Sequence, residues 1–522
     1  LETDPDVLDR QRQQFDFVQI DEYQDTNDMQ FRLVEALVGE HRNLCVVGDD
    51  DQSIYGWRGA RVENILQFEK DYPGTHVIRL EQNYRSTGNI LKAANAVIDH
   101  NDGRLGKNLW TAGVDGELIR VYTAYNEIDE ARFVIGRIQD WVERGGVRRD
   151  VAILYRSNAQ SRVFEEILLS ENIPYRVYGG LRFFERQEIK DALAYLRLLA
   201  TRHDDNAFER VVNVPTRGMG NKTLDTLRER AKLGGLSLWD ACGALIQERI
   251  LPARATQAVQ AFIDTIERLA RATAGLALPE QIEHVIHDSG LRDHYAKEKG
   301  EKGEARVENL DELISAGRNF TFDETQGLDP LAQFLAHAAL EAGEGQAEEW
   351  QDCVQLMSLH SAKGLEFALV FMTGMEEGLF PHDRSLNEPG RLEEERRLCY
   401  VGMTRARQEL YFSCAEIRRW QGREHYASPS RFLGEIPEEL LVPVRTQQQW
   451  RLAEAADTYA VAAAGTDARA GMRLGQRVHH DQFGEGVVLN YEGRGAHARV
   501  QVNFAAAGAK WLVVAYANLR SL

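Results

Sequence analysis

The feature that most constrains the fold is a repeated pattern, in which a short apolar run stops at polar or acidic residues and a helix-like stretch follows. The first series of such runs comprises Phe15 to Ile20, Leu44 to Val47 and Val77 to Leu80. The second series comprises Val151 to Tyr155, Ala368 to Met372 and Leu410 to Phe412. Strands that alternate with helices are typical of a parallel sheet, which binds ligands at the carboxyl ends of its strands. The sequence therefore predicts an α/β fold with functional groups in these polar segments.

The second series is interrupted between residues 180 and 350 by a stretch that is predicted to be mainly helical. Apolar residues recur there at three- and four-residue spacing, in Asp191 to Ala200, Thr223 to Leu233, Ala253 to Arg271 and Val307 to Ala316. Residues 446–472, which include an alanine-rich segment, favour a flexible linker. Short β-rich runs separated by glycine follow from residue 473 and predict a small barrel-like module.

Composition limits the classes of function. The net charge of -19 argues against a protein that coats nucleic acid through bulk electrostatics, so any DNA site must be a local groove. The five cysteines include no CxxC pair, which favours reduced, mostly buried thiols over a zinc or redox site. There is neither a membrane-length apolar run nor a signal-peptide pattern, and we expect a cytoplasmic protein.

Two carboxylates, Asp21 and Glu22, come directly after the first apolar run. One such residue can hold hydrated Mg²⁺, and its neighbour can orient or deprotonate an attacking water molecule. The pattern on its own is equally typical of a helix N-terminus, where acidic residues are favourable. The motifs that follow decide between these interpretations.

Five segments in a fixed order resemble the motifs of one helicase family. They are DEYQDTN from residue 21, VGDDDQSIYGWRGA from 47, LEQNYRST from 80, VQLMSLHSAKGLEF from 354 and EEERRLCYVGMTRAR from 393. They are similar to the Walker B, third, fourth, fifth and sixth motifs of UvrD-type superfamily 1 DNA helicases, the UvrD/PcrA/Rep group. The resemblance covers essentially the whole chain. It implies an ATP-dependent 3′ to 5′ DNA helicase and translocase that acts in nucleotide excision and mismatch repair and is associated with the nucleoid.

The resemblance also implies a domain plan built on two RecA-like parallel-sheet domains of the P-loop NTPase type. Residues 1–81 are expected to be the C-terminal part of the first motor domain, and 82–179 together with 351–445 the second. Residues 180–350 are expected to form a helical insertion in the second domain. After the linker at 446–472, residues 473–522 are expected to form a Tudor-like barrel.

For the ATP site, the family implies a set of residue roles. Asp21 would hold Mg²⁺ through water, Glu22 the catalytic water, Gln52 and Arg85 the γ-phosphate, Tyr84 the adenine and Glu366 the ribose, and Arg405 would be the arginine finger. These residue types suit the chemistry, because charge that develops on a transferring phosphoryl group calls for fixed cations. For Arg405 the alternative is a helix arginine paired with one of the glutamates at 393–395.

For DNA, aromatic and basic residues follow the γ-phosphate sensor directly. Base stacking on Tyr55 and Trp57, with Arg58 beside them, would bind single strands without regard to sequence; the alternative is that these rings belong to a core. Further candidate DNA contacts are Arg156, Asn158, Arg162, His360, Ser361, Gly218 and Gly220. Polar capping and an ordinary interhelical turn remain alternatives for these positions.

We expect ATP, Mg²⁺, single-stranded DNA and single-strand/duplex junctions as ligands. RNA polymerase, through the terminal module, and mismatch and excision repair proteins are the expected partners, and no membrane is expected. A non-enzymatic DNA-binding protein that contacts RNA polymerase remains an alternative, and so does a helicase fused to a nuclease. Glu22, Gln52, Arg85 and Arg405 argue against the first alternative, because a protein that does not use ATP would have little use for this set. The second alternative is disfavoured because no acidic metal cluster follows the barrel in the sequence.

No phosphate-binding GxxxxGK[ST] loop occurs in the sequence. The only Gly-Lys pair, Gly106-Lys107, is followed by Asn108, and the chain begins at Leu1 with residues typical of the middle of a domain. We therefore expect these 522 residues alone to bind ATP weakly and to hydrolyse little of it. Robust DNA-stimulated ATP hydrolysis by the purified 522-residue chain would contradict this expectation.

Overall fold

The computed structural model describes residues 5–39, 42–298, 300–322, 327, 329–343, 351–386, 388–420, 423–444, 477–480, 484–492, 499–504, 508–513 and 519–521. The chain divides into two compact units, Leu1–Pro443 and Val444–Leu522. The linker predicted at 446–472 lies outside the described residues. Among the helices that are described, none combines the length and the apolar character needed to cross a membrane.

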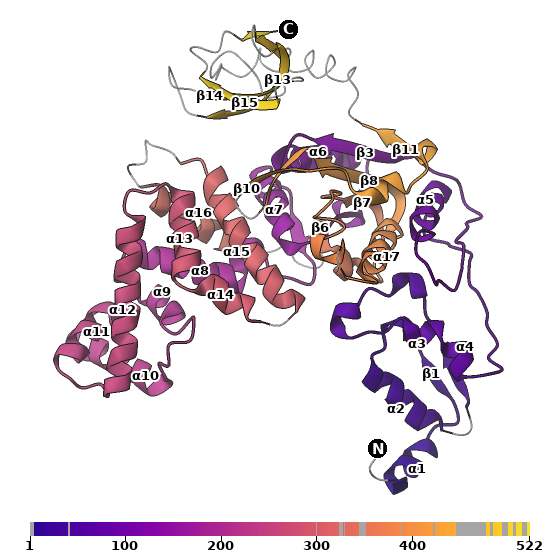
Figure 1. The fold of residues 1–522 in the computed structure, drawn as a ribbon, viewed down its shortest axis with the longest axis horizontal. Helices are drawn as coiled ribbons and strands as arrows, with labels where there is room; N and C mark the ends of the chain where they lie inside the picture. Colours follow the sequence, from indigo (N-terminus) through magenta and orange to yellow (C-terminus); the bar gives the residue numbers. More distant parts are fainter. Residues whose placement is uncertain are drawn as a thin grey trace. The chain divides into compact units, whose positions relative to one another are not determined.

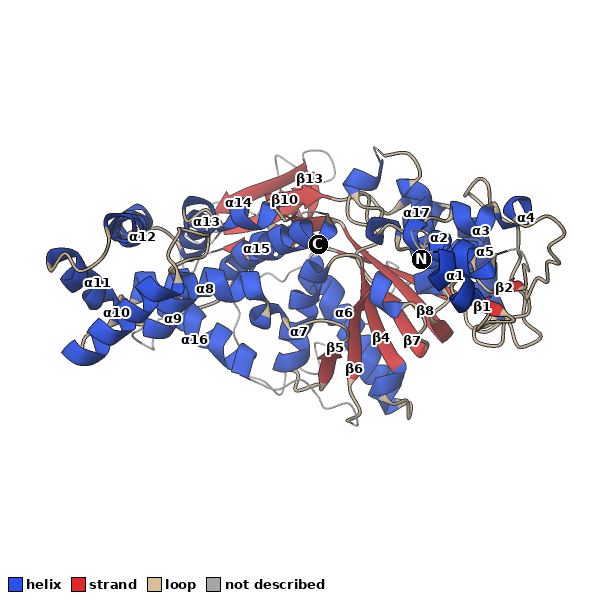
Figure 2. Ribbon diagram, turned by 90° about the horizontal axis from the view of Figure 1, so that it is seen from below, coloured by secondary structure: helices blue, strands red, loops and turns tan. Residues whose placement is uncertain are grey.

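The centre of the first unit is a seven-stranded parallel sheet with the order β11-β3-β8-β7-β4-β6-β5. Figure 2 shows β5, β6, β4, β7 and β8 side by side in this order. The bounds are β3 (Ile119–Ala124), β4 (Val151–Tyr155), β5 (Tyr175–Val177), β6 (Val354–Ser358), β7 (Phe367–Met372), β8 (Ala406–Ala415) and β11 (Leu441–Pro443). The sheet confirms the predicted α/β fold.

Both faces of this sheet are covered by helices, because its strands are apolar on both sides. Ala152 and Leu154 of β4 belong to a core shared with α5 (Gly88–Ile98) and α17 (Arg391–Met403). Val151 and Ile153 belong to a separate core shared with α6 (Glu127–Glu143) and α7 (Ser161–Ser170). Alternate residues of a strand point to opposite faces, so strands buried on both faces become continuous apolar runs in the sequence. An antiparallel hairpin of β9 (Ile417–Trp420) and β10 (Arg423–Tyr426) follows β8, and the short helix α18 (Arg431–Gly434) comes before β11.

The N-terminal part of the first unit contains only a two-stranded parallel sheet among its described residues. Its elements are α1 (Pro5–Arg12), β1 (Val18–Ile20), α2 (Asp28–Val38), β2 (Leu44–Val46), α3 (Glu63–Leu66) and α4 (Phe68–Asp71). The strand predicted at Val77 to Leu80 is wrong, because this segment is irregular. A strand needs a neighbour for its hydrogen bonds, and no described strand pairs with this segment. Ile78 and Leu80 are 72% and 81% exposed as a result.

The described part of the insertion contains nine α-helices with a core of their own, and Figure 1 shows these helices lying together. They are α8 (Gln187–Ala200), α9 (Asp205–Val211), α10 (Asn221–Gly234), α11 (Leu238–Gln247), α12 (Ala253–Thr273), α13 (Leu278–Asp288), α14 (Leu291–Ala296), α15 (Glu301–Asn319) and α16 (Pro330–Gly343). The four segments with helical spacing lie within α8, α10, α12 and α15. The predicted helical character of this stretch is therefore confirmed.

The described residues of the second unit form a five-stranded antiparallel sheet with the order β15-β14-β13-β12-β16. Its strands are β12 (Arg477–His480), β13 (Gly484–Glu492), β14 (Arg499–Phe504), β15 (Gly508–Val513) and β16 (Arg520–Ser521). Val478, Val488 and Val502 are fully buried in its small core. The β-rich character predicted for this region is confirmed.

Candidate active site

The acidic motif forms a tight turn at the carboxyl end of β1. Glu22 has a φ of 51°, in the left-handed region, and its backbone N–H donates to Asp21 Oδ1 over 2.9 Å. A non-glycine residue in that region is unusual and is often held there for a functional reason. Both side chains are exposed, and the Glu22 carboxylate accepts a hydrogen bond of 2.6 Å from Gln24 Nε2.

Gln24 connects this motif to the loop that carries the predicted γ-phosphate sensor. Its side chain is fully buried, and its Oε1 accepts a 2.9 Å hydrogen bond from the backbone N–H of Asp49. Asp49 in turn accepts a 2.6 Å hydrogen bond from Nε2 of Gln52. A single chain of hydrogen bonds therefore fixes Glu22 relative to Gln52. The sequence reasoning missed Gln24 and Asp49, although both lie inside the motifs that it singled out.

Lys363 links these acidic groups to the large sheet. It follows a short 3₁₀ helix, Leu359–Ala362, after β6, and its side chain is only 8% exposed. Its Nζ donates to Asp25 Oδ2 over 2.5 Å and to the backbone oxygen of Gln52 over 2.9 Å, and it lies 3.3 Å from Glu22 Oε2. Burial raises the pKa of Asp25, and the bond to Lys363 opposes that shift. Lys363 is thus a site residue that the sequence analysis did not name.

The fourth motif places Arg85 against the fifth. Arg85 Nε donates to Glu366 Oε2 over 2.7 Å, and this pairing lowers the pKa of Glu366. Asn83 Oδ1 accepts hydrogen bonds from the N–H groups of Arg85 and Ser86, which fixes the turn before α5. Tyr84 is 86% exposed, so the face of its ring is open to a ligand.

Arg405 is buried without a counter-charge among the described residues. It is 2% exposed, and its guanidinium donates to the backbone oxygens of Val401 and Leu365 and to Oγ1 of Thr404, over 3.0 to 3.2 Å. Burial, followed by the nearby Arg85, lowers its pKa to about 10, and Asp49 and Glu366 oppose that shift without bonding to it. A buried cation that lacks an anion is costly, which makes this position favourable for a ligand's negative charge.

The glutamates at 393–395 do not pair with Arg405. Glu394 accepts a 2.8 Å hydrogen bond from the backbone N–H of Gly56, and Glu395 binds Arg156 through two guanidinium nitrogens at 2.7 and 3.0 Å. The alternative interpretation of Arg405 as a helix arginine in a solvated ion pair therefore does not fit the structure.

Tyr55, Trp57, Arg58 and His360 lie together in what we call the aromatic strip. The Arg58 guanidinium carbon is 4.5 Å from the Trp57 ring centroid and 5.0 Å from that of Tyr55. The rings of Trp57 and His360 meet edge to face at 6.3 Å, and the Tyr55 hydroxyl donates to the His360 carbonyl oxygen over 3.3 Å. Lys363 Nζ lies 5.3 Å from the Tyr55 ring centroid, so the strip adjoins the acidic site.

His360 provides a test of this packing through its pH dependence. Burial, together with Arg156 and Arg58, holds its pKa well below the ordinary value. Below pH ~6.5 the unfolded chain binds a proton that the folded protein does not bind, so stability falls as the pH drops, by ~1.4 kcal/mol per unit. We expect His360→Gln to remove this part of the slope in urea unfolding between pH 6.5 and 5. An identical slope in the variant and the parent protein would contradict the buried, neutral ring.

Some of the remaining predicted DNA contacts are bound to glutamate side chains of the protein, and others are accessible at the surface. Arg156 is bound to Glu395, as described above, and Arg162 is 1% exposed. Arg162 donates over 2.5 Å both to Glu166 of α7 and to Glu312 of α15. The structure therefore does not place Arg162 on a surface that DNA could reach. Asn158 is exposed and Ser361 is half-buried.

Arg162 belongs to a polar interface between α15 of the insertion and the sheet domain. Glutamates 304, 308 and 312 follow one another at four-residue intervals along α15 and pair with Arg384, His382 and Arg162 respectively. Burial raises the pKa of Glu312 to about 7. Ion pairs and hydrogen bonds, rather than a shared apolar core, make these contacts.

Gly218 and Gly220 lie in an exposed turn before α10. Gly218 has a φ of 75°, which favours glycine, and Gly220 is the residue that precedes the helix. The side chain of Asn213 accepts from the N–H of Arg217 over 2.8 Å and donates to the Met219 oxygen over 2.9 Å. This geometry leaves both the phosphate-contact and the ordinary-turn interpretations open.

The sequence profile of the UvrD-like helicase C-terminal domain matches residues 78–417, which is more than half of the chain. The chain belongs to the UvrD-like helicase family. Within it, the profile of the UvrD/REP helicase N-terminal domain matches residues 1–73, so part of that domain is present here. The profile of the PcrA/UvrD tudor domain matches residues 474–520.

Several characterised UvrD-like helicases are similar along the whole chain. DNA helicase II of Escherichia coli K12 is 57% identical over 519 residues, which cover 99% of this chain and 72% of that protein. DNA helicase II of Salmonella typhimurium has the same identity and coverage. The ATP-dependent DNA helicase PcrA of Bacillus subtilis is 42% identical over 536 residues, again covering 99% of this chain and 72% of its own length.

Proposed function

We infer that this UvrD-like helicase is an ATP-dependent DNA helicase that hydrolyses ATP at the site around Glu22, Gln52, Arg85 and Arg405. Residues 1–81 would be part of the first RecA-like motor domain, and 82–179 with 351–445 the second. The helical insertion would extend over 180–350, and residues 473–522 would close into a Tudor-like barrel. The names of the relatives support the activity, and the parallel sheet supports the domain assignment.

The observation that carries the proposal is the unpaired charge of Arg405. Its guanidinium bonds only to neutral acceptors among the described residues, and the nearby Arg85 contributes to lowering its pKa. Glu366 forms its ion pair with Arg85, and the second cation beside it, Arg405, is unfavourable without an ion-pair partner unless a ligand supplies negative charge. A transferring phosphoryl group supplies that charge.

Asp21 and Glu22 suit the metal and water roles. Mg²⁺ in nucleotide sites keeps several water molecules and binds through one or two carboxylates, and Asp21 offers an exposed carboxylate at the end of β1. When Mg²⁺ is bound, it would neutralise phosphate charge. Glu22, held by Gln24, would orient and deprotonate the attacking water, while Gln52 and Arg85 would bind the γ-phosphate and Tyr84 the adenine.

Lys363 would carry the nucleotide state to DNA. It contacts Glu22, Asp25 and Gln52 on one side and the Tyr55 ring on the other. A change of charge at the acidic site would therefore shift the Lys363 side chain, and through it the aromatic strip that Lys363 contacts. Closure around ATP and relaxation after hydrolysis would become movement of the two motor domains along a strand.

Trp57 is the residue of the strip that we expect to bind DNA most strongly. Trp57→Ala should weaken binding of single-stranded oligonucleotides by about 1–3 kcal/mol, because one stacked base loses its platform. Fluorescence anisotropy with a labelled oligonucleotide measures the effect. Trp239→Ala in the insertion is the matched control and should leave affinity unchanged. Equal affinities for the Trp57 variant and the parent protein would remove Trp57 from the DNA site.

Unwinding with 3′ to 5′ polarity, in nucleotide excision and mismatch repair, completes the proposal, with repair proteins as partners and RNA polymerase as a partner of the terminal module. A strand-displacement assay with the full-length protein on 3′-tailed and 5′-tailed duplexes tests it. We expect ATP-dependent displacement of the 3′-tailed duplex alone. Displacement of only the 5′-tailed duplex would overturn the polarity, and no displacement of either would overturn the helicase proposal.

A further inference from the structure

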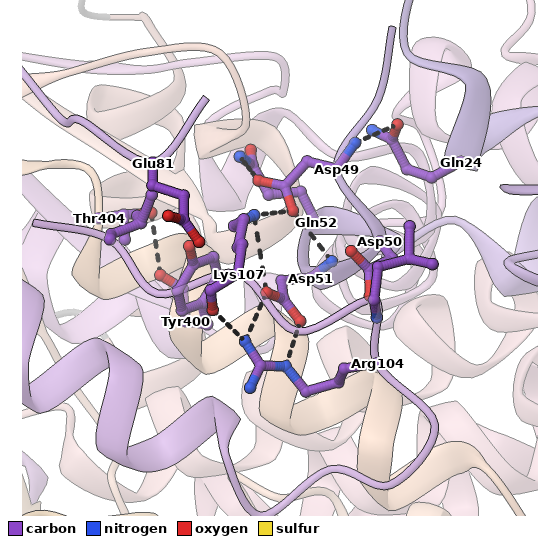
Figure 3. Close-up of polar contacts among 12 residues, drawn as sticks. Gln24, Asp49, Asp50, Asp51, Gln52, Glu81, Arg104, Lys107, Tyr400 and Thr404 are labelled. Carbon is purple, nitrogen blue, oxygen red and sulfur yellow. Dashed lines mark hydrogen bonds and ion pairs between the residues drawn. The ribbon is translucent and has the colours of Figure 1, made fainter. Parts of the chain in front are cut away.

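Lys107 lies among three aspartates in the loop of the predicted γ-phosphate sensor, although it belongs to a different part of the chain. It comes from the segment that joins α5 to β3, and its side chain is 15% exposed. Its Nζ forms an ion pair with Asp49 Oδ1 and lies 3.6 Å from Asp51 Oδ2. Figure 3 shows Lys107 between these aspartates and the ring of Tyr400.

The three aspartates are balanced by groups of the protein itself. Oxygens of Asp49, Asp50 and Asp51 lie within 4.8 Å of one another, close enough to repel strongly. Arg104 binds both oxygens of Asp51 at 2.7 and 2.8 Å, and the N–H of Leu105 donates to Asp50 over 2.9 Å. Lys107 supplies the remaining cation at Asp49. Residues 104–107 therefore occupy the place that a bound cation would otherwise take.

Asp49 links Lys107 to Gln52 through the two oxygens of its carboxylate. One carboxylate oxygen of Asp49 faces Lys107, and the other accepts the 2.6 Å hydrogen bond from Gln52 Nε2. A carboxylate has two oxygens in one rigid plane, so fixing one oxygen fixes the direction of the other. Lys107, together with the N–H of Asp51, which donates to the same Asp49 oxygen over 3.0 Å, therefore sets the orientation of the Gln52 carboxamide.

The same lysine touches the helix end that carries Arg405. Its Nζ is 5.5 Å from the ring centroid of Tyr400, a buried residue of α17. The backbone carbonyl oxygen of Tyr400 accepts a 3.0 Å hydrogen bond from Thr404 Oγ1, which itself accepts from Arg405 Nη2 over 3.0 Å. Lys107 is therefore the point at which the sensor loop, the α5–β3 segment and the arginine-finger turn meet.

We propose that Lys107 is a positioning residue for ATP hydrolysis, which holds Gln52 through Asp49 and sets it relative to the turn of Arg405. This inference rests on the proposed function for its kinetic test. Misplacement of a group by about an ångström can cost ~10²-fold in rate. A group needed mainly in the transition state affects kcat more than KM.

The proposal is tested with Lys107→Met in the full-length protein, and Lys92→Met is the control variant. Lys92 is a half-exposed lysine of α5 that is paired with Asp115 at 2.8 Å, so its loss controls for removal of one ion pair. We expect kcat for DNA-stimulated ATP hydrolysis to fall ~10- to 100-fold with little change in KM, and Lys107→Arg to restore most of it. Lys92→Met should leave both constants unchanged.

The outcomes that overturn the proposal are distinct. An unchanged kcat in Lys107→Met removes the positioning role. A lower kcat with a lower melting temperature and no rescue by Lys107→Arg assigns Lys107 a merely structural role. Asp49→Asn should lower kcat as well, and combining it with Lys107→Met should add little, because both changes break one chain of contacts. Full additivity of the two variants would contradict that chain.

A readout that needs no turnover separates this inference from the proposed function. In the 522-residue chain without nucleotide, Lys107→Met should speed hydrogen exchange of the amides of Asp51, Gln52 and Ser53, which are now bonded within the loop. Exchange in β4 should not change. Faster exchange in the loop, together with no ATP hydrolysis by the full-length protein, would keep the link from Lys107 to Gln52 and reject the proposed activity. Unchanged exchange in the loop would reject the positioning role.

Discussion

Replacing Arg405 with alanine is expected to lower kcat for DNA-stimulated ATP hydrolysis by ~10³- to 10⁵-fold, the effect of losing an arginine finger. The reason is the buried guanidinium, which no described carboxylate neutralises and which is therefore available to phosphate charge. Binding of single-stranded DNA should survive, because the aromatic strip lies on other segments. Steady-state ATP turnover and oligonucleotide anisotropy with the full-length protein measure the two quantities.

Two variants control for other effects of that substitution. Arg405→Lys keeps the charge but loses the planar fork, so we expect only partial turnover. Arg431→Ala removes a surface arginine paired with Glu377 at 2.7 Å and should leave turnover unchanged. The backbone oxygens of Val401 and Leu365 lose donors in Arg405→Ala, so the melting temperature must be measured too. Normal unwinding by the alanine variant would remove the arginine-finger assignment.

Glu22→Gln is expected to lower kcat by about 10²- to 10⁴-fold, the usual contribution of a general base. The carboxamide has nearly the same shape, so its Oε1 still accepts from Gln24 Nε2 while the basic oxygen is lost. KM for ATP should change little. Asp28→Asn, an exposed carboxylate paired with Arg61 at 3.0 Å, is the matched control.

The measurement for Glu22→Gln is a single-turnover assay, which separates the chemical step from product release. The variant should still bind single-stranded DNA and should trap ATP without hydrolysing it. A kcat within twofold of the parent protein would assign the water-activating role to another residue, and Asp25, which lies in the same turn, would become the next candidate.

The sequence predicted β4, β7 and β8 of the large sheet because these strands are buried on both faces and contain continuous apolar runs, whereas β3, β5, β6 and β11 were not among the predicted strands. The same rule failed at Val77 to Leu80, where the apolar run is present but no described strand pairs with it. An apolar run indicates that a segment tends to be buried, but it does not show that a neighbouring strand is present to pair with it. The β-rich terminal module was predictable because its short alternating strands are separated by glycine.

The candidate site was predictable as a set of residues but not as a network. Asp21, Glu22, Gln52, Arg85 and Arg405 were named from their motifs. Lys363 was missed because its partner Asp25 is 338 residues away in the chain, and only the folded structure shows that the two meet. Arg162 was assigned to DNA because its motif is polar, whereas the structure buries it between Glu166 and Glu312. A basic residue in a motif does not reveal whether a carboxylate from another helix forms an ion pair with it.

The contact between α15 and the sheet domain has a mechanical consequence. The glutamates at 304, 308 and 312 of α15 contact arginine and histidine side chains and not an apolar surface. Charged groups that part can each regain a shell of water, so such a joint costs less to open than an apolar one of equal area. We therefore expect added salt to weaken the exposed Arg384–Glu304 pair of this joint more than the buried Arg162–Glu312 pair, while the apolar cores of the insertion and of the sheet domain are unaffected.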